Sequence, residues 1–561
     1  MFFRRCKPHF FIAAVLFRRN WAGKKMSPRA CNSTRKKIYL KSERGIPVKK
    51  SSTPTCCLTL PLKLEKWQED RLAKRFEIAR QIYNTLVRAE LKKLDGVKRS
   101  APYQEIQERI RVLYCNSQRE NGELQQLYKA RGTLLKSFGF TEYGFKSDMK
   151  HYYKHFWENI GASVAIHGIA VQVWAAFEKM LYSVGKKVHY KRFGDISSLQ
   201  GYSTAKRSGG IEIIFRGTYI EWKGLKLPLK LSPSNAYEYE MLSYRVKYVR
   251  LIRKPGKHKD RWYAQLILEG KPAIKRDRAT GEIVHPVGSG TVGLDIGPQT
   301  LAYSAPGGAD LVELADQVQN IEQMKRCLQR KLDRSRRATN PDNYLNDGTV
   351  KRGVKLTHNT SKRYRKVQQE LKYLQHRQAE TRKRQHIQLA NHLLSLGNCF
   401  YVEKMLWSSL AHRAKETAVS EKTRKIKRKK RFGKSIANKA PATLIRILQQ
   451  KCVSLGLPGV VKVPTSVRAS QYNHQSGEYT QKPLSKRWND MPDGQRIQRD
   501  LYSAFLLQHY DPLTKRFQSD SLQRDYPQFV EYHRQAIQRL SALPKTPSSM
   551  GIHRNSHECE S

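Results

Sequence analysis

The stretch from residue 292 to residue 315, VGLDIGPQTLAYSAPGGADLVELA, decides the fold of the C-terminal half of this chain. Three short apolar runs are separated by Gly and Pro, a pattern typical of successive strands joined by tight turns. Asp295 interrupts the first run, where a buried carboxyl group without a metal or a partner would be costly. We therefore expect a sheet that carries a functionally important acid.

The residues after this stretch alternate between helical and strand patterns. Apolar side chains at helical spacing predict one helix around residues 321–332 and another around 364–374. A strand (NCFYVEKM), a helix (ATLIRILQQKCVSLG), a strand (GVVKVP) and a last helix (RDLYSAFLL) follow. Three strands, helix, strand, helix, strand, helix is the order of elements in an RNase H-like domain, which we expect at 289–512.

Two further acids occupy the ends of core elements in this order. Glu403 lies at the end of the strand CFYVE, and Asp500 lies at the start of the last helix. Hydrolysis of a phosphodiester bond by two divalent metal ions needs clustered carboxylates, because hard cations take oxygen ligands. We predict that Asp295, Glu403 and Asp500 are catalytic and hold two Mg²⁺ or Mn²⁺ ions, with Asp295 bridging them. Taken singly, each acid has an ordinary alternative role as a turn, a cap or a solvated strand end.

The composition indicates a polyanionic partner. The chain has 561 residues, with 106 Lys and Arg against 47 Asp and Glu, and a formal net charge of +59. Nucleic acid is the partner that supplies many negative charges. An RNA-coating protein of the ribosomal kind is the alternative that charge alone leaves open. The hydrophobic content of 39% allows real cores, and the length predicts several domains.

The pattern of apolar residues changes twice along the N-terminal half. Helical patterning follows a short first strand, and alternating runs such as WYAQLILEG predict strands with one packed and one charged face. The sequence leaves a β-barrel and a β-sandwich open for these strands. The predicted parts are a basic, disordered arm (1–55), the first strand of a wedge β module (56–62), a helical recognition lobe (63–187), the rest of the β module (188–288) and, beyond the nuclease domain, a basic and polar tail (513–561).

Cysteine usage and the ends of the chain give weaker indications. Nine cysteines occur without a C-x-x-C pair, so we expect neither a disulfide framework nor a thiolate zinc site. We expect no membrane span, and Met1 and Met26 remain alternative start residues. The expected location is the cytoplasm of a prokaryote, in association with the nucleoid.

Three blocks of sequence resemble the TnpB proteins of insertion sequences and the related compact type V CRISPR effectors. They are GLDIG (293–297) with Ala302 after it, YVEKM (401–405), and residues 470–488 running on to RDLYSAFLL (499–507). The resemblance covers roughly residues 55–510. It implies a guide RNA and double-stranded DNA as partners, cleavage by a RuvC-type nuclease, and roles for the β module and the helical lobe in gripping the guide–target duplex.

The chain departs from this family where a four-cysteine zinc ribbon would stand, at 470–499. The ligand positions fall on Asn473, Ser476, Asp490 and Asp493, so we expect no zinc there, although Gly477 and Gly494 keep the loop pattern. His474 with the two acids could hold another metal, but we favour a hydrogen-bonded loop pair. Tyr502 replaces a common Asn, which makes Asp500 the least secure of the three acids.

Two basic segments are candidates for nucleic-acid contacts. The segment 423–435 (TRKIKRKKRFGKS) contains eight Lys and Arg, which predicts a phosphate track or, alternatively, a solvated charge run. The segment 186–194 (KKVHYKRFG) interleaves aromatic and basic residues, whose rings could stack on bases or pack in a core. The predicted contacts are Lys191, Arg192, Arg424, Lys425, Lys427, Arg428, Lys429, Lys430, Arg431 and Lys434.

Together these observations favour an RNA-guided DNA endonuclease of the TnpB kind, linked to an insertion sequence and acting as a monomer. Two alternatives from other classes remain. One is a nuclease-inactive, RNA-guided DNA-binding repressor. The other is a guide-free RNA-binding or junction-resolving protein with the same fold.

Overall fold

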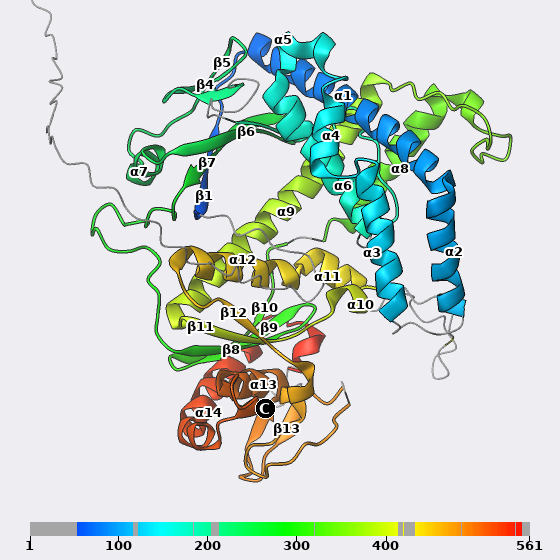
Figure 1. Cartoon of the computed structure of the whole chain (residues 1–561). Helices are drawn as coiled ribbons and strands as arrows, with labels where there is room; N and C mark the ends of the chain where they lie inside the picture. The colour runs from blue at the N-terminus through cyan, green and yellow to red at the C-terminus, as the bar shows by residue number, and fades with distance from the viewer. Residues whose placement is uncertain are drawn as a thin grey trace, which may run out of the picture. The chain divides into compact units, whose positions relative to one another are not determined.

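The computed structural model describes residues 53–115, 122–182, 185–202, 212–318, 320–412, 419, 432–483, 485–544 and 546–552. Within them lie a helical region, an antiparallel β module and a C-terminal α/β region, which Figure 1 colours along the chain from blue to red. The predicted basic arm at 1–55 lies outside the described residues except for its last three positions.

A five-stranded mixed sheet forms the centre of the C-terminal region, in the order β10-β9-β8-β11-β12. Its strands are β8 (Thr291–Ile296), β9 (Thr300–Ala305), β10 (Gly308–Glu313), β11 (Cys399–Glu403) and β12 (Val460–Val463). The first three are antiparallel to one another, whereas β11 runs parallel to β8, and β12 runs parallel to β11. The chain follows the predicted succession of strands and helices.

Helices cover both faces of this sheet. On one face, α9 (Lys362–Leu396) and α12 (Pro441–Leu455) share a core with Val292 and Leu294 of β8. On the other, α13 (Arg499–Gln508) and α14 (Ser519–Ser541) pack with Ala302 of β9. Because successive strand residues point to opposite faces, Asp295 belongs to the face that α13 covers.

The contact between β8 and α13 depends on Gly293. A Cβ atom at this position would lie only 2.0 Å from the carbonyl oxygen of Ala504. The missing side chain therefore lets the helix approach the strand closely enough to face Asp295.

The prediction of a polar tail at 513–561 is wrong for its described part. Residues of α14 are buried in the core against α13, among them Leu522, Tyr526 and Phe529. Their spacing of four and three residues is that of one helix face. The other elements of this region are α8 (Glu322–Thr339), η3 (Pro341–Asn343), α10 (Trp407–Leu410), α11 (Gly433–Lys439), η4 (Thr465–Val467), η5 (Ala469–Gln471), β13 (Trp488–Asp490), β14 (Arg496–Gln498), β15 (Tyr510–Asp511), β16 (Arg516–Phe517) and η6 (Ser548–Met550).

The β module contains two antiparallel sheets joined at an edge. The larger sheet has the order β1-β7-β6-β2 and the smaller the order β3-β4-β5. A bridge between Leu62 and Leu229 links the ends of β1 and β5. The elements are β1 (Thr55–Pro61), β2 (Ser198–Tyr202), β3 (Ile213–Phe215), β4 (Tyr219–Trp222), β5 (Leu225–Pro228), α7 (Ala236–Leu242), β6 (Val246–Lys254) and β7 (Arg261–Glu269).

The helical region and the β module share one hydrophobic core. The Phe76 ring of the first helix meets the Trp262 ring of β7 edge-on, with centroids 4.9 Å apart. Arg75 donates to the backbone carbonyl of Trp222 and lies 4.9 Å from the centroid of its ring. The helices are α1 (Lys66–Arg99), α2 (Ala101–Cys115), α3 (Gly122–Ser137), α4 (Glu142–Met149), η1 (Lys154–Phe156), α5 (Trp157–Ile160), η2 (Ser163–Ile169) and α6 (Ala170–Tyr182).

One described helical stretch, Ser163–Tyr182, is long and apolar enough to cross a membrane by length and composition alone. Its residues Val164, Val173 and Phe177 are fully buried in the core that the helical region shares with the β module. The core helix of a folded domain passes the same test, so the stretch is weak evidence for a membrane span.

Candidate functional site

Asp295 is the fifth of the six residues of β8, on the face that α13 covers. Burial raises the pKa of its carboxyl group well above the ordinary value, and the nearby carboxyl groups of Asp500 and Glu403 raise it further. The Ser503 hydroxyl opposes this rise, but its geometry falls short of a full hydrogen bond. A bound cation would stabilise the charged form of a carboxyl group in this environment.

Glu403 ends β11, the strand that runs parallel to β8. Burial raises the pKa of its carboxyl group, and the backbone of Ala469 partly opposes the rise. Parallel neighbours bring their carboxyl ends to the same edge of a sheet, so Glu403 and Asp295 occupy neighbouring strands near one edge.

Asp500 lies in the first turn of α13 and is engaged by two arginines. Nη2 of Arg499 is 3.2 Å from its Oδ1, and Nη1 of Arg487 is 3.7 Å from its Oδ2. Arg499 is itself fixed, because its Nη1 donates to the carbonyl of Lys486 at 3.1 Å. The sequence analysis did not single out either arginine. Adjacency to Asp500 gave no indication of where the Arg499 guanidinium would point.

The three predicted acids affect each other electrostatically without forming a closed ligand set. In the part of the chain that the structure describes, no three His, Cys, Asp or Glu side chains are close enough to share a metal ion. The donor chemistry nevertheless fits a hard divalent cation, since all three groups are carboxylates. A cation would also offset the like charges that raise the pKa of Asp295.

A buried histidine supports the helix that carries Asp500. The Gln498 side chain caps α13 by accepting from the Leu501 amide at 2.8 Å. The Gln498 amide donates to Nε2 of His533 on α14 at 2.9 Å. His533 is buried, and burial lowers its pKa to about 4, so the ring is neutral and can accept this bond. The sequence analysis missed His533 because it assigned this region to the tail.

The predicted zinc-ribbon positions lie in two hairpin turns that contain Gly477 and Gly494, both with positive φ. Gln475 joins the turns: its amide donates to Oδ1 of Asn473, and its Nε2 donates to Oδ2 of Asp493, each at 3.0 Å. Ser476 accepts from the Glu478 amide at 3.4 Å, and Asp490 pairs with Lys486 at 3.2 Å. These groups are thus engaged within the loop itself.

Tyr502, the residue that departs from the family pattern, anchors this loop from α13. Its hydroxyl oxygen accepts from the His474 amide at 3.0 Å and lies 2.6 Å from Nδ1 of the same residue. Burial lowers the pKa of His474, which favours a neutral ring. Its Nδ1 can then accept a hydrogen bond from the Tyr502 hydroxyl. The aromatic residue therefore points into the hairpin pair.

Only part of the predicted nucleic-acid contacts can be located. The basic residues from 424 to 431 lie outside the described residues, whereas Lys434 is exposed in the first turn of α11. The Lys191 backbone is tied to Asn84 of α1, with its amide donating at 2.8 Å, and Arg192 is exposed beside it. Phe193 is 79% exposed, so it is free to stack on a base and takes no part in a core.

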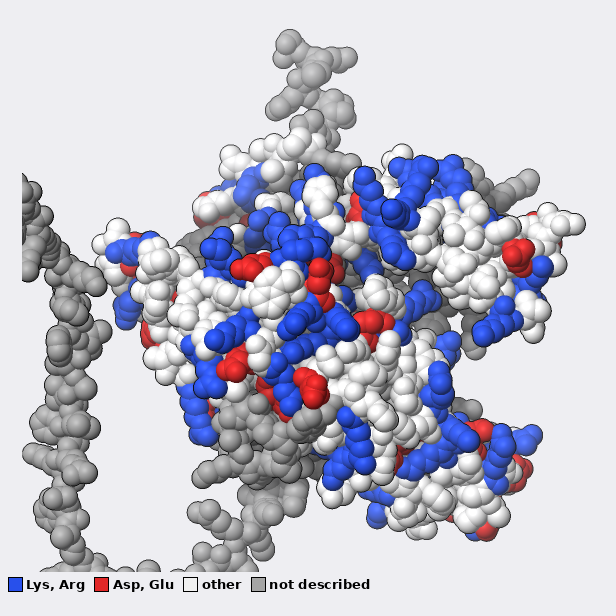
Figure 2. All heavy atoms as spheres, turned by 90° about the horizontal axis from the view of Figure 1, so that it is seen from above, with Lys and Arg blue, Asp and Glu red and all other residues white. Residues whose placement is uncertain are grey.

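Basic side chains gather on the surface as well as in the sequence. Figure 2 shows Lys and Arg spread over most of the face that it presents, with fewer Asp and Glu between them. Helix α8 contributes strongly, because seven of its 18 residues are Lys or Arg. Such a surface suits a nucleic-acid backbone.

No protein-family model and no curated protein matches the chain. Solved Cas12f complexes resemble it. The cryo-EM structure of a Cas12f1–sgRNA–target DNA complex is 11% identical, with a TM-score of 0.36, and the match covers 82% of this chain and 100% of that chain. A CRISPR–Cas12f ternary complex is 10% identical, with a TM-score of 0.22, and covers 82% and 99%.

Proposed function

We propose that this chain is a metal-dependent DNA endonuclease directed by a guide RNA. The observation that carries the nuclease assignment is the placement of three carboxyl groups, those of Asp295 on β8, Glu403 on β11 and Asp500 on α13, near enough for the other two to raise the pKa of Asp295. The proposal that the chain binds a guide RNA rests on the sequence blocks that resemble TnpB proteins. The excess of 106 basic over 47 acidic residues supports a large nucleic-acid partner.

The three acids would hold two Mg²⁺ or Mn²⁺ ions, which supply an activated water and stabilise charge on the leaving 3′ oxygen. The residues of the chain prepare this site. Gly293 lets α13 approach β8, and His533 and Gln498 fix the start of α13. Arg499 forms an ion pair with the carboxylate of Asp500.

One observation favours a second candidate, a nuclease-inactive DNA-binding protein. Arg487 and Arg499 both pair with Asp500, and the described residues contain no closed set of metal ligands. Cleavage of target DNA by the wild-type chain, loaded with its co-purified RNA and Mg²⁺, separates the two functions. RNA of one defined sequence in the purified protein would also argue against a guide-free function.

The test of the site is Asp295→Ala in the RNA-loaded chain. We expect cleavage to be abolished, whereas guided DNA binding stays near wild type, because the substitution leaves every exposed lysine and arginine that could contact phosphates unchanged. Asp520→Ala is the matched control, because it removes an exposed carboxylate from the same region and should leave cleavage unchanged. Retained cleavage by Asp295→Ala would overturn the assignment.

A further inference from the structure

A cavity of about 760 Å³ lies between α8, α9 and the turn that joins β6 to β7. Its apolar lining includes Leu328, Tyr373 and Leu374, with Met324 at the rim, where it is 49% exposed. The polar lining consists of Lys257, His258, Gln323, Lys331, Lys366, Gln369 and Glu370. None of these residues belongs to the acidic site around Asp295.

Hydrogen bonds hold the walls of this cavity together. Nε2 of Gln369, on α9, donates to the carbonyl of Gly256 at 3.1 Å and to Oδ1 of Asp260 at 2.9 Å. Lys254 of β6 pairs with Glu380 of α9 at 3.5 Å. The cavity therefore exists before any ligand enters, as small-molecule sites usually do.

Three exposed lysines surround the apolar lining. Lys257, Lys331 and Lys366 form no ion pair with any acid in the described ranges, so their charges remain available. A second cavity of about 420 Å³ shares Met324 and Leu374 with the first and extends along the two helices to further arginines, Arg377 and Arg384. The two cavities thus form a cationic groove with an apolar floor.

We propose that the larger cavity binds one unpaired nucleotide of a single-stranded nucleic acid. Its base would lie on the apolar floor, with Tyr373 available for stacking, and the adjoining phosphates would lie on the three lysines. Glu370, the acid of this lining, would accept a hydrogen bond from an amino group on the edge of the base. A base flanked by phosphates matches both the apolar floor and the cationic rim, whereas an apolar peptide would leave the lysines without partners.

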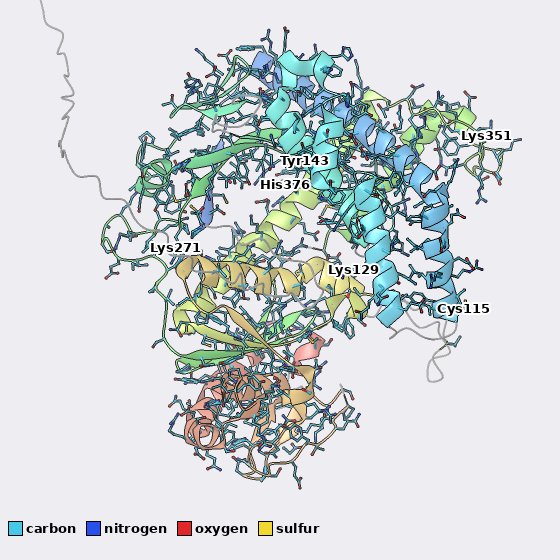
Figure 3. The ribbon with its side chains drawn as sticks, viewed as in Figure 1. Cys115, Lys129, Tyr143, Lys271, Lys351 and His376 are labelled. Carbon is cyan, nitrogen blue, oxygen red and sulfur yellow. The ribbon has the colours of Figure 1, made fainter. Side chains whose placement is uncertain are left out.

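Cys327 offers a direct test, because this exposed residue lines the cavity. Its alkylation by N-ethylmaleimide would be followed by peptide mass spectrometry, with and without a 15-nucleotide single-stranded RNA. Cys115 at the end of α2 is exposed and serves as the internal control (Figure 3). We expect RNA to slow alkylation of Cys327 severalfold and to leave Cys115 unaffected. An abasic oligonucleotide of equal length should give little protection.

The same measurement with single-stranded DNA distinguishes the source of the nucleotide. Protection by RNA alone assigns the cavity to the guide, and protection by DNA alone assigns it to the target strand; both support the proposal. Equal alkylation with and without either strand overturns it. Equal protection by the abasic strand also overturns it, because phosphates alone would then cover the thiol.

Substitutions give an independent measurement. Cys327→Phe would fill the cavity and should weaken oligonucleotide binding about tenfold, since stacking of one base contributes on that order. Lys331→Ala and Lys366→Ala should each lower the slope of log affinity against log salt by about one. Lys362→Ala is the matched control, one turn earlier on α9 and outside the lining, and should change binding less. Equal losses in Lys362→Ala and Lys366→Ala would contradict the site.

This inference rests on the proposed function only in requiring that the chain binds nucleic acid. Failure of this inference can be told apart from failure of the proposed function, because the cavity variants keep Asp295 and should still cleave once loaded at saturating RNA. Conversely, an inactive wild-type chain could still show protection of Cys327. The alkylation arm uses the native sequence, so it stays informative if Cys327→Phe does not fold.

Discussion

Asp500 shows how a single residue can be predicted in position but not in partnership. Its place at the start of a helix followed from the sequence, whereas its two arginine partners became visible only in three dimensions. Substrate phosphates are the natural competitors for Arg487 and Arg499, because guanidinium groups bind phosphate and carboxylate alike. Nucleic-acid binding would then release the acid for catalysis.

His533 carries a pH prediction at this scale. Its pKa of about 4 in the folded chain lies below the ordinary 6.5, because burial disfavours the charged ring. Its contribution to the free energy of unfolding is therefore complete above pH 6.5 and is lost as the pH falls to 4. The full effect amounts to about 3 kcal/mol. We expect His533→Gln to lose less stability than wild type between pH 7 and pH 4.5, as measured by urea unfolding.

A matched control for this prediction is His358→Gln, which replaces an exposed histidine. It should retain the pH dependence of the wild type. If His533→Gln also retained it, the burial of His533 would contribute nothing to the pH dependence.

At the scale of elements, α14 was the main error of the sequence reasoning. The positions Leu522, Tyr526, Phe529, His533 and Ala536 repeat at helical spacing, and that signal was readable. Basic and polar residues between them gave the segment the composition of a tail. Composition averages over all faces of a helix, whereas burial concerns one face only.

Phe529→Ala tests the role of α14. The Phe529 ring stacks on Phe505 of α13 at a centroid distance of 4.4 Å and is 2% exposed. Its loss should destabilise the chain by about 3 to 5 kcal/mol, measured by denaturant unfolding, because a cavity forms under the helix that carries Asp500. Leu513→Ala, at a residue 91% exposed, should change stability by less than about 0.5 kcal/mol. Similar effects of the two changes would show that α14 does not support the core.

The hairpin pair before Asp500 permits a combined metal and mutation test. We expect less than one equivalent of zinc per chain by elemental analysis, and the same unfolding midpoint with and without EDTA. Tyr502→Phe should cost about 1 to 3 kcal/mol, since it leaves the His474 amide and ring without their hydroxyl partner. Tyr479→Phe, at a half-exposed residue, is the control. A full equivalent of zinc would contradict the reading of Asn473, Ser476, Asp490 and Asp493.

For the whole molecule, the net charge of +59 predicts strong salt dependence of nucleic-acid binding. If at least six phosphates are contacted, affinity should fall about a thousandfold or more between 50 and 200 mM salt, because bound counterions are released. Filter binding or anisotropy with the RNA-loaded chain measures the slope, and Asp295→Ala should show the same slope. A salt-independent affinity would argue that the basic surface does not contact phosphates.

The broad succession of helical and strand regions could be predicted from the sequence, because periodicity and charge are local properties. The three acids were located on the expected strands and helix for the same reason. The sequence could not show that α1 and β7 share a core through Phe76 and Trp262, because long-range packing leaves no periodic signal. The cavity between α8 and α9 was equally invisible, since its lining combines three segments.

The pairing of β1 with β7 has a consequence for synthesis on the ribosome. Thr59 bonds through its hydroxyl to Gln265, 206 residues further along the chain. At about 5 to 20 residues per second, the first strand waits roughly 10 to 40 seconds for its partner. During that interval an apolar, unpaired strand emerges into the cell. The sheet that contains β1 can thus be completed only after β7 has been synthesised, and we expect chains stalled before residue 261 to depend on chaperones.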